Sequence, residues 1–211
     1  MKKWKPRKGT IKLCILSAVL LTVIIWTIWG NTALMVNTVT VTAGRIPVAF
    51  SGFRIAQVSD LHNAEFGENN ARLLELLSES GPDIIVITGD LVDSGHTDID
   101  IAISFVEEAA RIAPVYYVTG NHEARLSQYD RLRNGLEAAG VSMLEDRAVE
   151  LERDGEKITL VGLSDPDFTV RSDIFGEVPA MVSTKLESLA DTESSYTILL
   201  SHRPELFESY A

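Results

Sequence analysis

Cysteine is nearly absent from this sequence, and basic residues are scarce after the first twelve positions. Cys14 is the only cysteine among 211 residues, so an intrachain disulfide and a zinc site built from several thiolates are both excluded. Six of the 19 basic residues precede residue 13, which leaves 13 basic against 30 acidic residues in 13–211. Nucleic-acid affinity depends mainly on Lys and Arg contacts with phosphates. We therefore expect no nucleic-acid partner.

Charged residues are also missing from a long N-terminal run. The 17 residues from Leu13 to Trp29 carry no charge, and the uncharged stretch continues to Gly44. This is enough to cross a hydrocarbon core of roughly 30 Å at about 1.5 Å per residue. The basic segment 1–12 precedes the run, so the positive-inside rule predicts a cytoplasmic N-terminus and an extracytoplasmic remainder. The alternative is a cleaved signal peptide, but the run is long for one and no Ala-x-Ala site follows it. We favour an uncleaved, single-pass cell-membrane anchor over residues 13–30.

The rest of the chain alternates between strand and helix patterns. Residues 31–50 read as a linker with an edge strand at 38–42, where β-branched residues alternate, and residues 51–211 read as one domain. Apolar runs predict strands at 53–58, 84–87, 115–118, 149–153, 158–163 and 197–200. Apolar residues at helical spacing predict helices at 69–80, 98–112 and 129–139, and a further helix begins at 204–210. This order predicts an α/β sheet with an antiparallel portion, in which Asp154-Gly155 makes a hairpin turn.

Polar residues follow directly after four of the predicted strands. They are Asp60 and His62, Asp90 and Asp93, Asn121 and His122, and His202. Ligands of open α/β sheets bind outside the carboxyl ends of the strands, so we expect these side chains to share one site. Singly, each has an ordinary interpretation as a turn former, a helix N-cap or a satisfied polar residue. Together they indicate a metal site, and this mixture of carboxylate, amide and imidazole groups fits zinc, iron or manganese better than calcium or copper.

Local spacing supports this interpretation. Asp60 and His62 are two residues apart, so they face the same side if the segment is extended. A glycine precedes Asp90, which lets the backbone turn sharply and presents the carboxylate. Outside this set, we expect His96 to be a solvated loop residue and Asp165-Pro166-Asp167 to be a turn.

The polar segments resemble the motifs of the calcineurin-like metallophosphoesterase superfamily. They read Asp60-Leu61-His62, Gly89-Asp90-Leu91-Val92-Asp93, Gly120-Asn121-His122-Glu123 and His202. The resemblance covers most of the chain after residue 50, and Gly-Asn-His-Glu is its most specific element. The apolar N-terminal run makes the chain most similar to bacterial membrane-associated members of the YkuE/YaeI type. The resemblance implies a four-layer α/β/β/α sandwich, preceded here by one transmembrane helix.

The resemblance also implies two divalent metal ions. Asp60 and His62 would hold the first ion, Asp90 would bridge both, and Asn121 and His202 would hold the second. The identity of the metals, whether Mn, Fe or Zn, stays open.

Catalytic roles follow from the same resemblance. His122 would act as the general acid for the leaving oxygen, and Asp93 would orient it. A metal-bound hydroxide would be the nucleophile. We therefore expect hydrolysis of a phosphomonoester or phosphodiester at the outer face of the membrane, with lipids, envelope polymers or nucleotides as candidate substrates.

One element of the family pattern is missing. The pattern ends with Gly-His-x-His, and its position would fall beyond Ala211, so each metal would lack one imidazole. We interpret the sequence as a fragment of a longer gene product. The alternative is a natural truncation, which would be a non-catalytic membrane-anchored protein with weakened metal binding. The sequence indicates no oligomeric state.

Overall fold

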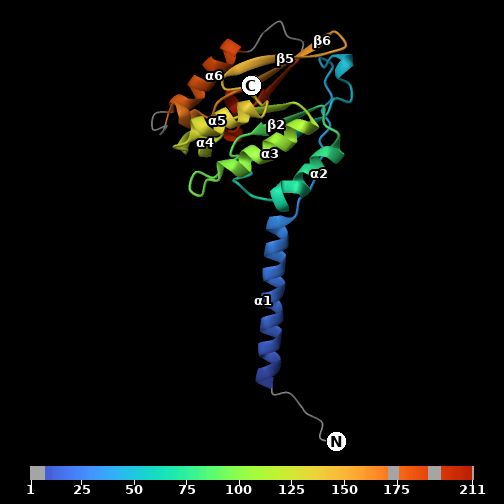
Figure 1. Ribbon diagram of the computed structural model, residues 1–211, viewed down its shortest axis with the longest axis vertical. Coiled ribbons are helices and arrows are strands. Elements are labelled where there is room, and N and C mark those ends of the chain that lie inside the picture. Colours follow the sequence, from blue (N-terminus) through green and yellow to red (C-terminus); the bar gives the residue numbers. More distant parts are fainter. Residues whose placement is uncertain (1–7, 171–175, 190–195, 211) are drawn as a thin grey trace, which may run out of the picture. The chain divides into compact units, whose positions relative to one another are not determined.

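The computed structural model describes residues 8–170, 176–189 and 196–210, which belong to two compact units, 1–38 and 39–211. The first unit contains the helix α1 (Lys8–Thr32) (Figure 1). Its segment Gly9–Thr27 is long and apolar enough to cross a membrane, a property that anchors share with signal sequences. None of this segment is buried within the protein, as expected for a helix whose apolar surface faces lipid.

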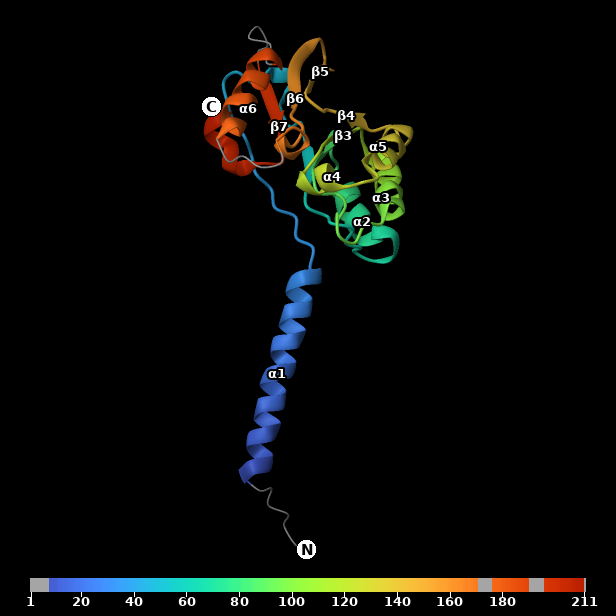
Figure 2. The ribbon, with the colours of Figure 1, turned by 90° about the vertical axis from the view of Figure 1, so that its left-hand side faces the viewer.

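Two β-sheets form the centre of the second unit (Figures 1 and 2). The first sheet is parallel, in the order β1 (Ile55–Val58), β2 (Ile84–Thr88), β3 (Val115–Val118) and β4 (Ser142–Met143). The second contains the antiparallel hairpin of β5 (Arg147–Arg153) and β6 (Glu156–Gly162), with β7 (Thr197–Leu200) parallel to β6. Asp154 and Gly155 turn the hairpin with φ of 51° and 82°, as a type I′ turn requires.

Helices cover the outer faces of both sheets. The α-helices of this unit are α2 (Ala71–Ser80), α3 (Ile99–Ile112), α4 (Asn121–Arg125), α5 (Tyr129–Ala138) and α6 (Glu177–Leu189). Short 3-10 helices are η1 (Val48–Phe50), η2 (Glu68–Asn70), η3 (Pro166–Phe168) and η4 (Pro204–Ser209).

Alternate residues of the central strand β2 enter two different hydrophobic cores. Ile85 and Ile87 belong to the core that includes residues of α2, α3 and α5. Ile84 and Val86 belong to a second core, which contains residues of β6 and β7. Because strand side chains alternate between faces, both faces of the first sheet are buried.

A third core covers the outer face of the second sheet. Val178 and Val182 of α6 pack with Leu163, and Leu199 of β7 packs against this cluster. The order of layers is therefore helices, first sheet, second sheet and α6, which confirms the predicted α/β/β/α sandwich.

Most of the predicted elements are present, and the strands at 115–118 and 197–200 match their predicted bounds. Two predictions are wrong. Residues 38–42 belong to no strand in the part of the chain that is described, and Val39 and Val41 are exposed. Alternating β-branched residues favour extended backbone, but a strand also needs a neighbour to pair with. Residues 204–209 form a 3-10 helix, not the start of an α-helix.

Candidate metal centre

The predicted ligands meet at the carboxyl ends of β1, β2, β3 and β7, around the side chain of Asp90. This residue is 3% exposed. Its Oδ2 lies 3.6 Å from Nε2 of His62, 3.4 Å from Nε2 of His202 and 4.0 Å from Nε2 of His122. Nε2 of His62 is 3.7 Å from Oδ1 of Asp60. One nearly buried carboxylate thus faces three imidazoles that come from three separate loops.

Left-handed backbone at the strand ends produces this convergence. Asp60, His62 and Asp90 have φ of 55°, 47° and 51°, a conformation that costs non-glycine residues roughly 1–3 kcal/mol each and concentrates at functional sites. The expectation that Asp60 and His62 lie on one side of an extended segment is wrong, because a tight turn brings their side chains together. The expected sharp turn before Asp90 is confirmed by Gly89, whose φ is 86°.

Two glycines let the loops after β2 and β3 approach each other closely. A Cβ atom on Gly89 would lie 2.6 Å from the backbone nitrogen of Gly120 and 2.8 Å from Nδ1 of His202. A Cβ atom on Gly120 would overlap Oδ1 of Asp90 and lie 2.6 Å from its backbone nitrogen. No real Cβ contact is this short, so both positions require glycine if Asp90 and His202 are to keep their places.

The buried carboxylate of Glu123 ties the same two loops together. Its Oε2 accepts hydrogen bonds from the backbone N–H groups of Asp90 (2.8 Å) and Gly120 (2.7 Å). Its Oε1 accepts from Leu91 (2.8 Å) and Val92 (3.3 Å). Glu123 is fully buried, so these N–H groups have no access to water and depend on this side chain.

His202 is oriented by the backbone of β2. Its Nδ1 lies 2.8 Å from the carbonyl oxygen of Thr88. A carbonyl can only accept, so Nδ1 carries a proton and Nε2 faces Asp90 and, at 3.3 Å, Oδ1 of Asn121. Metal-binding histidines commonly donate their second N–H in this way, which fixes the ring and its tautomer.

The electrostatics of Asp90 and His202 favour positive charge between the two side chains. The hydrogen bond with Asp90 is the main reason that the pKa of His202 is raised to about 9, against the opposing effect of desolvation. Burial by itself would raise the pKa of Asp90, but the hydrogen bonds from His202 and from the His122 backbone outweigh it, and the pKa is lowered. The site therefore holds a carboxylate charge that attracts a cation.

These residues fit a divalent metal ion. Two ligand atoms that each lie about 2.0–2.2 Å from one cation are about 2.8–3.6 Å apart at tetrahedral or octahedral angles. Three contacts, from Asp90 to His62 and His202 and from His202 to Asn121, span 3.3 to 3.6 Å. In addition, Nδ1 of His62 is buried without a hydrogen-bond partner in the described structure, so the ring is not committed to a protein acceptor on that side.

His122 points its Nε2 toward Asp90, while its Nδ1 accepts a hydrogen bond from the backbone N–H of Ser94 at 3.0 Å. The backbone N–H of His122 donates to Oδ1 of Asp90 at 2.9 Å. Asp93 has a carboxylate oxygen within 4.8 Å of nitrogens of His62 and His122. However, its Oδ1 accepts from the backbone N–H groups of Gly95 and His96. The hydrogen bond that orients the His122 ring thus comes from Ser94.

The segment Asp165-Pro166-Asp167 is more than the predicted turn. Asp165 does cap the 3-10 helix η3, but its buried carboxylate also receives Nε and Nη2 of Arg203, at 2.5 and 2.9 Å. Nη2 of Arg203 donates to Asp167 as well, at 2.9 Å. This ion pair holds the residue next to His202. His96 is exposed, as predicted.

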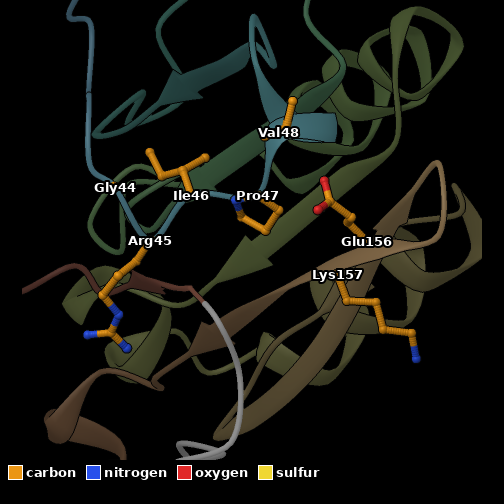
Figure 3. Close-up of a pocket in the computed structure, with 7 residues that line it drawn as sticks. All are labelled: Gly44, Arg45, Ile46, Pro47, Val48, Glu156 and Lys157. Carbon is orange, nitrogen blue, oxygen red and sulfur yellow. The ribbon is translucent and has the colours of Figure 1, made fainter.

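A hollow elsewhere in the second unit lies between segment 44–48 and the β5–β6 turn (Figure 3). It is lined by Gly44, Arg45, Ile46, Pro47, Val48, Glu156 and Lys157. None of these is a predicted site residue. The hollow therefore shares no residue with the predicted metal centre.

Comparison with known proteins agrees with this geometry. The model of the calcineurin-like phosphoesterase family matches residues 53–211. This chain belongs to that family. The Bacillus subtilis protein YkoQ, described as an uncharacterized metallophosphoesterase, is 27% identical over 176 residues, which are 81% of this chain and 60% of YkoQ. A Danio rerio transmembrane protein with a metallophosphoesterase domain is 26% identical over 126 residues, covering 57% of this chain and 29% of that protein.

Among solved structures, the phosphopantetheinyl hydrolase of Mycobacterium tuberculosis is similar, with a TM-score of 0.52 and 22% sequence identity. The match covers 72% of this chain and 68% of that one, and it supports the family fold. The chain spans less than two thirds of the length of YkoQ and of the Danio rerio protein. Membership in this family implies divalent metal ions, and the side chains around Asp90 are suitable ligands for them.

Several residues of this site were not predicted. Glu123 belongs to the Gly-Asn-His-Glu motif. Its role as a buried acceptor of four hydrogen bonds is visible only once the loops after β2 and β3 are placed. Asn63 follows the Asp-x-His motif directly and was not singled out. Arg203 follows His202, and its only sequence signal is a basic residue in an acidic domain.

Proposed function

We propose that this protein hydrolyses phosphate esters with a two-metal centre in its calcineurin-like domain. The observation that carries the proposal is the position of Asp90, whose Oδ2 lies within 3.6 Å of both His62 and His202. A carboxylate between two imidazoles from different loops is suited to bridge two cations. Asp60 and His62 would hold one ion, and Asn121 and His202 the other.

The bound cations would supply Lewis acidity, polarising the phosphoryl group and activating water. The remaining chemistry belongs to His122. Its Nδ1 accepts from Ser94, so in the neutral ring the proton sits on Nε2, which faces the centre. From there the N–H can donate a hydrogen bond to the leaving oxygen and stabilise the negative charge that develops on it. A neutral imidazole is too weak an acid to give up this proton, so hydrogen-bond donation takes the place of the general-acid role that the resemblance implied.

The proposal includes the location. The apolar segment of α1 and the basic residues before it support a single-pass anchor with the phosphoesterase domain outside the cell membrane. Tethering favours phosphate esters of lipids or envelope polymers. The acidic body continues to argue against nucleic acid as substrate.

The test is hydrolysis of bis(p-nitrophenyl) phosphate by the full chain in detergent, with Mn²⁺ or Zn²⁺ content measured on the same samples. Asp90→Ala should abolish both turnover and the paired metal content. Asp130→Asn, at an exposed position on α5, is the matched control. An Asp90→Ala variant as active as the parent rejects the bridging carboxylate. Low metal content together with no turnover supports the alternative, a membrane-anchored protein that is not a catalyst and holds metal weakly.

A further inference from the structure

Asn63 connects the loop after β1 to both ends of the loop of residues 93–98. Its Oδ1 accepts hydrogen bonds from the backbone N–H groups of Asp93 (2.9 Å) and Asp98 (3.2 Å). Its Nδ2 donates to the carbonyl oxygen of Asp98 at 2.6 Å. The residue has a φ of 59°, and its backbone N–H donates to Leu91. The Asn63 side chain thus joins the two ends of the 93–98 loop.

The 93–98 loop is closed by its own side chains. Oδ1 of Asp93 accepts from the N–H groups of Gly95 (2.7 Å) and His96 (3.0 Å). The hydroxyl of Thr97 donates to the carbonyl oxygen of Asp93 at 2.5 Å. With its ends held by Asn63, the loop has little freedom to shift as a unit.

The loop presents one backbone group to the catalytic histidine of the proposed function. The N–H of Ser94 donates to Nδ1 of His122 at 3.0 Å, and the Ser94 hydroxyl lies 3.3 Å from the same nitrogen. A backbone N–H cannot accept, so it selects the tautomer with a free lone pair on Nδ1 and the proton on Nε2. Nε2 is the nitrogen that faces Asp90.

We propose that Asn63 is a positioning residue that acts through Ser94 on His122. By bridging both ends of the 93–98 loop, it keeps the Ser94 N–H against Nδ1 of His122 and holds the protonated Nε2 toward the metal centre. The proposal rests on the proposed function, in which the Nε2–H of His122 donates a hydrogen bond to the leaving oxygen. Asn63 would then be a functional residue that contacts neither the oxygen atoms of the metal ligands nor the substrate.

Removing the side chain should weaken catalysis without emptying the metal site. In Asn63→Ala, kcat should fall about 10–100-fold, the range typical for residues that orient a functional group from behind it, with KM and metal content close to those of the parent. Asn63→Asp retains an oxygen acceptor for the two N–H groups but replaces the Nδ2 donor with an oxygen that faces the Asp98 carbonyl, so it should recover only part of the loss. Asn134→Ala, at an exposed position on α5, is the matched control.

A double-mutant cycle separates positioning from general structural damage. If Asn63 acts through His122, adding Asn63→Ala to His122→Ala should cost no further activity. An equal loss in both backgrounds would overturn the proposal. Full activity of His122→Ala alone would instead reject the role of His122 in the proposed function.

Nuclear magnetic resonance tests the contact without turnover. The chain has four histidines, so the ring of His122 can be assigned in ¹⁵N-histidine-labelled, Zn²⁺-loaded protein by comparison with His122→Ala. At pH 8 the parent and Asn134→Ala should show an unprotonated Nδ1 and a protonated Nε2, and Asn63→Ala should show averaged tautomers. Unchanged His122 nitrogens in Asn63→Ala would refute the positioning role, whatever the activity.

Discussion

The substitution Glu123→Gln tests how far one buried carboxylate holds the loops after β2 and β3 in place. Glu123 accepts from four backbone N–H groups, two on each oxygen. Glutamine has the same shape but only one acceptor oxygen. Whichever way the amide is turned, its NH₂ group faces two backbone donors. Both donors then lose their acceptor in a site that water does not reach.

The magnitude follows from those two donors. A buried donor left without a partner costs about 1–3 kcal/mol, so Glu123→Gln should lower the free energy of unfolding by about 2–6 kcal/mol. This is a large share of the stability of an ordinary domain, which is about 5–15 kcal/mol. Since two of the four N–H groups belong to Asp90 and Gly120, the loss falls on the loops that place the carboxylate of Asp90.

The assay is urea unfolding of the full chain in detergent, followed by far-UV circular dichroism. Tryptophan fluorescence is unsuitable because all three tryptophans, Trp4, Trp26 and Trp29, precede residue 39 and so lie in the first unit. Glu107→Gln, at an exposed position on α3, is the control and should change stability by less than about 0.5 kcal/mol. A Glu123→Gln variant within 1 kcal/mol of the parent would refute the reasoning, because the carboxylate could not then be accepting four bonds (~1 kcal/mol being the least cost of one lost acceptor).

Three further outcomes are expected. Gly120→Ala should displace Asp90 and abolish metal binding, measured as metal content after gel filtration, because its Cβ would overlap the Asp90 carboxylate; Gly44→Ala, which has open space around it and no positive φ, should keep its metal. Mn²⁺ at 100 times its Kd should stabilise the parent against urea by about 2.7 kcal/mol, EDTA should remove that gain, and Asp90→Ala should show none. In a Cys14→Ser background, Glu152→Cys should react with a membrane-impermeant maleimide in intact cells and Lys3→Cys only after permeabilisation; the opposite pattern would reverse the proposed orientation.

Short-range signals in the sequence were sufficient for most of the fold. The continuous apolar run of β2 and the helical spacing in α3 can be recognised without knowing their neighbours, and Asp154-Gly155 specifies its own turn. The strand predicted at 38–42 failed because Thr and Val alternate there without a partner in the described structure. The 3-10 helix at 204–209 has the composition of a helix start, and the sequence alone does not distinguish the two forms.

The sequence was sufficient to predict which candidate ligands lie together, but not which residues hold them in place. Asp60, His62, Asp90 and Asn121 follow strands of the parallel first sheet, which brings them to one edge. His202 follows β7 of the second sheet, so it joins them only through the packing of the two sheets. The supporting contacts join residues about 30 positions apart, such as Asn63 with Asp93 or Glu123 with Asp90. These contacts depend on left-handed backbone at the strand ends. The sequence does not reveal that conformation, because residues such as Asp60 and His62 also occur in extended chain.

The Arg203–Asp165 pair offers a second support of the site that can be tested on its own. Nε and Nη2 of Arg203 contact both oxygens of Asp165, whose side chain is fully buried. The hydrogen bond with Asp165 raises the pKa of Arg203 further above its ordinary value. Removing the cation would leave a buried carboxylate unpaired, which typically costs about 3–5 kcal/mol.

Arg203→Ala should therefore lower the free energy of unfolding by about 3–5 kcal/mol, and Arg203→Lys should recover only part of this, because an ammonium cannot make the bidentate contact. Arg131→Ala provides the contrast, since it breaks an ion pair with Asp100 whose side chains are 54% and 76% exposed, and such pairs contribute at most about 1 kcal/mol. Because Arg203 adjoins His202, metal affinity should fall in Arg203→Ala and remain unchanged in Arg131→Ala. Equal urea midpoints for the two alanine variants would show that the buried pair does not hold the β7 end of the metal centre.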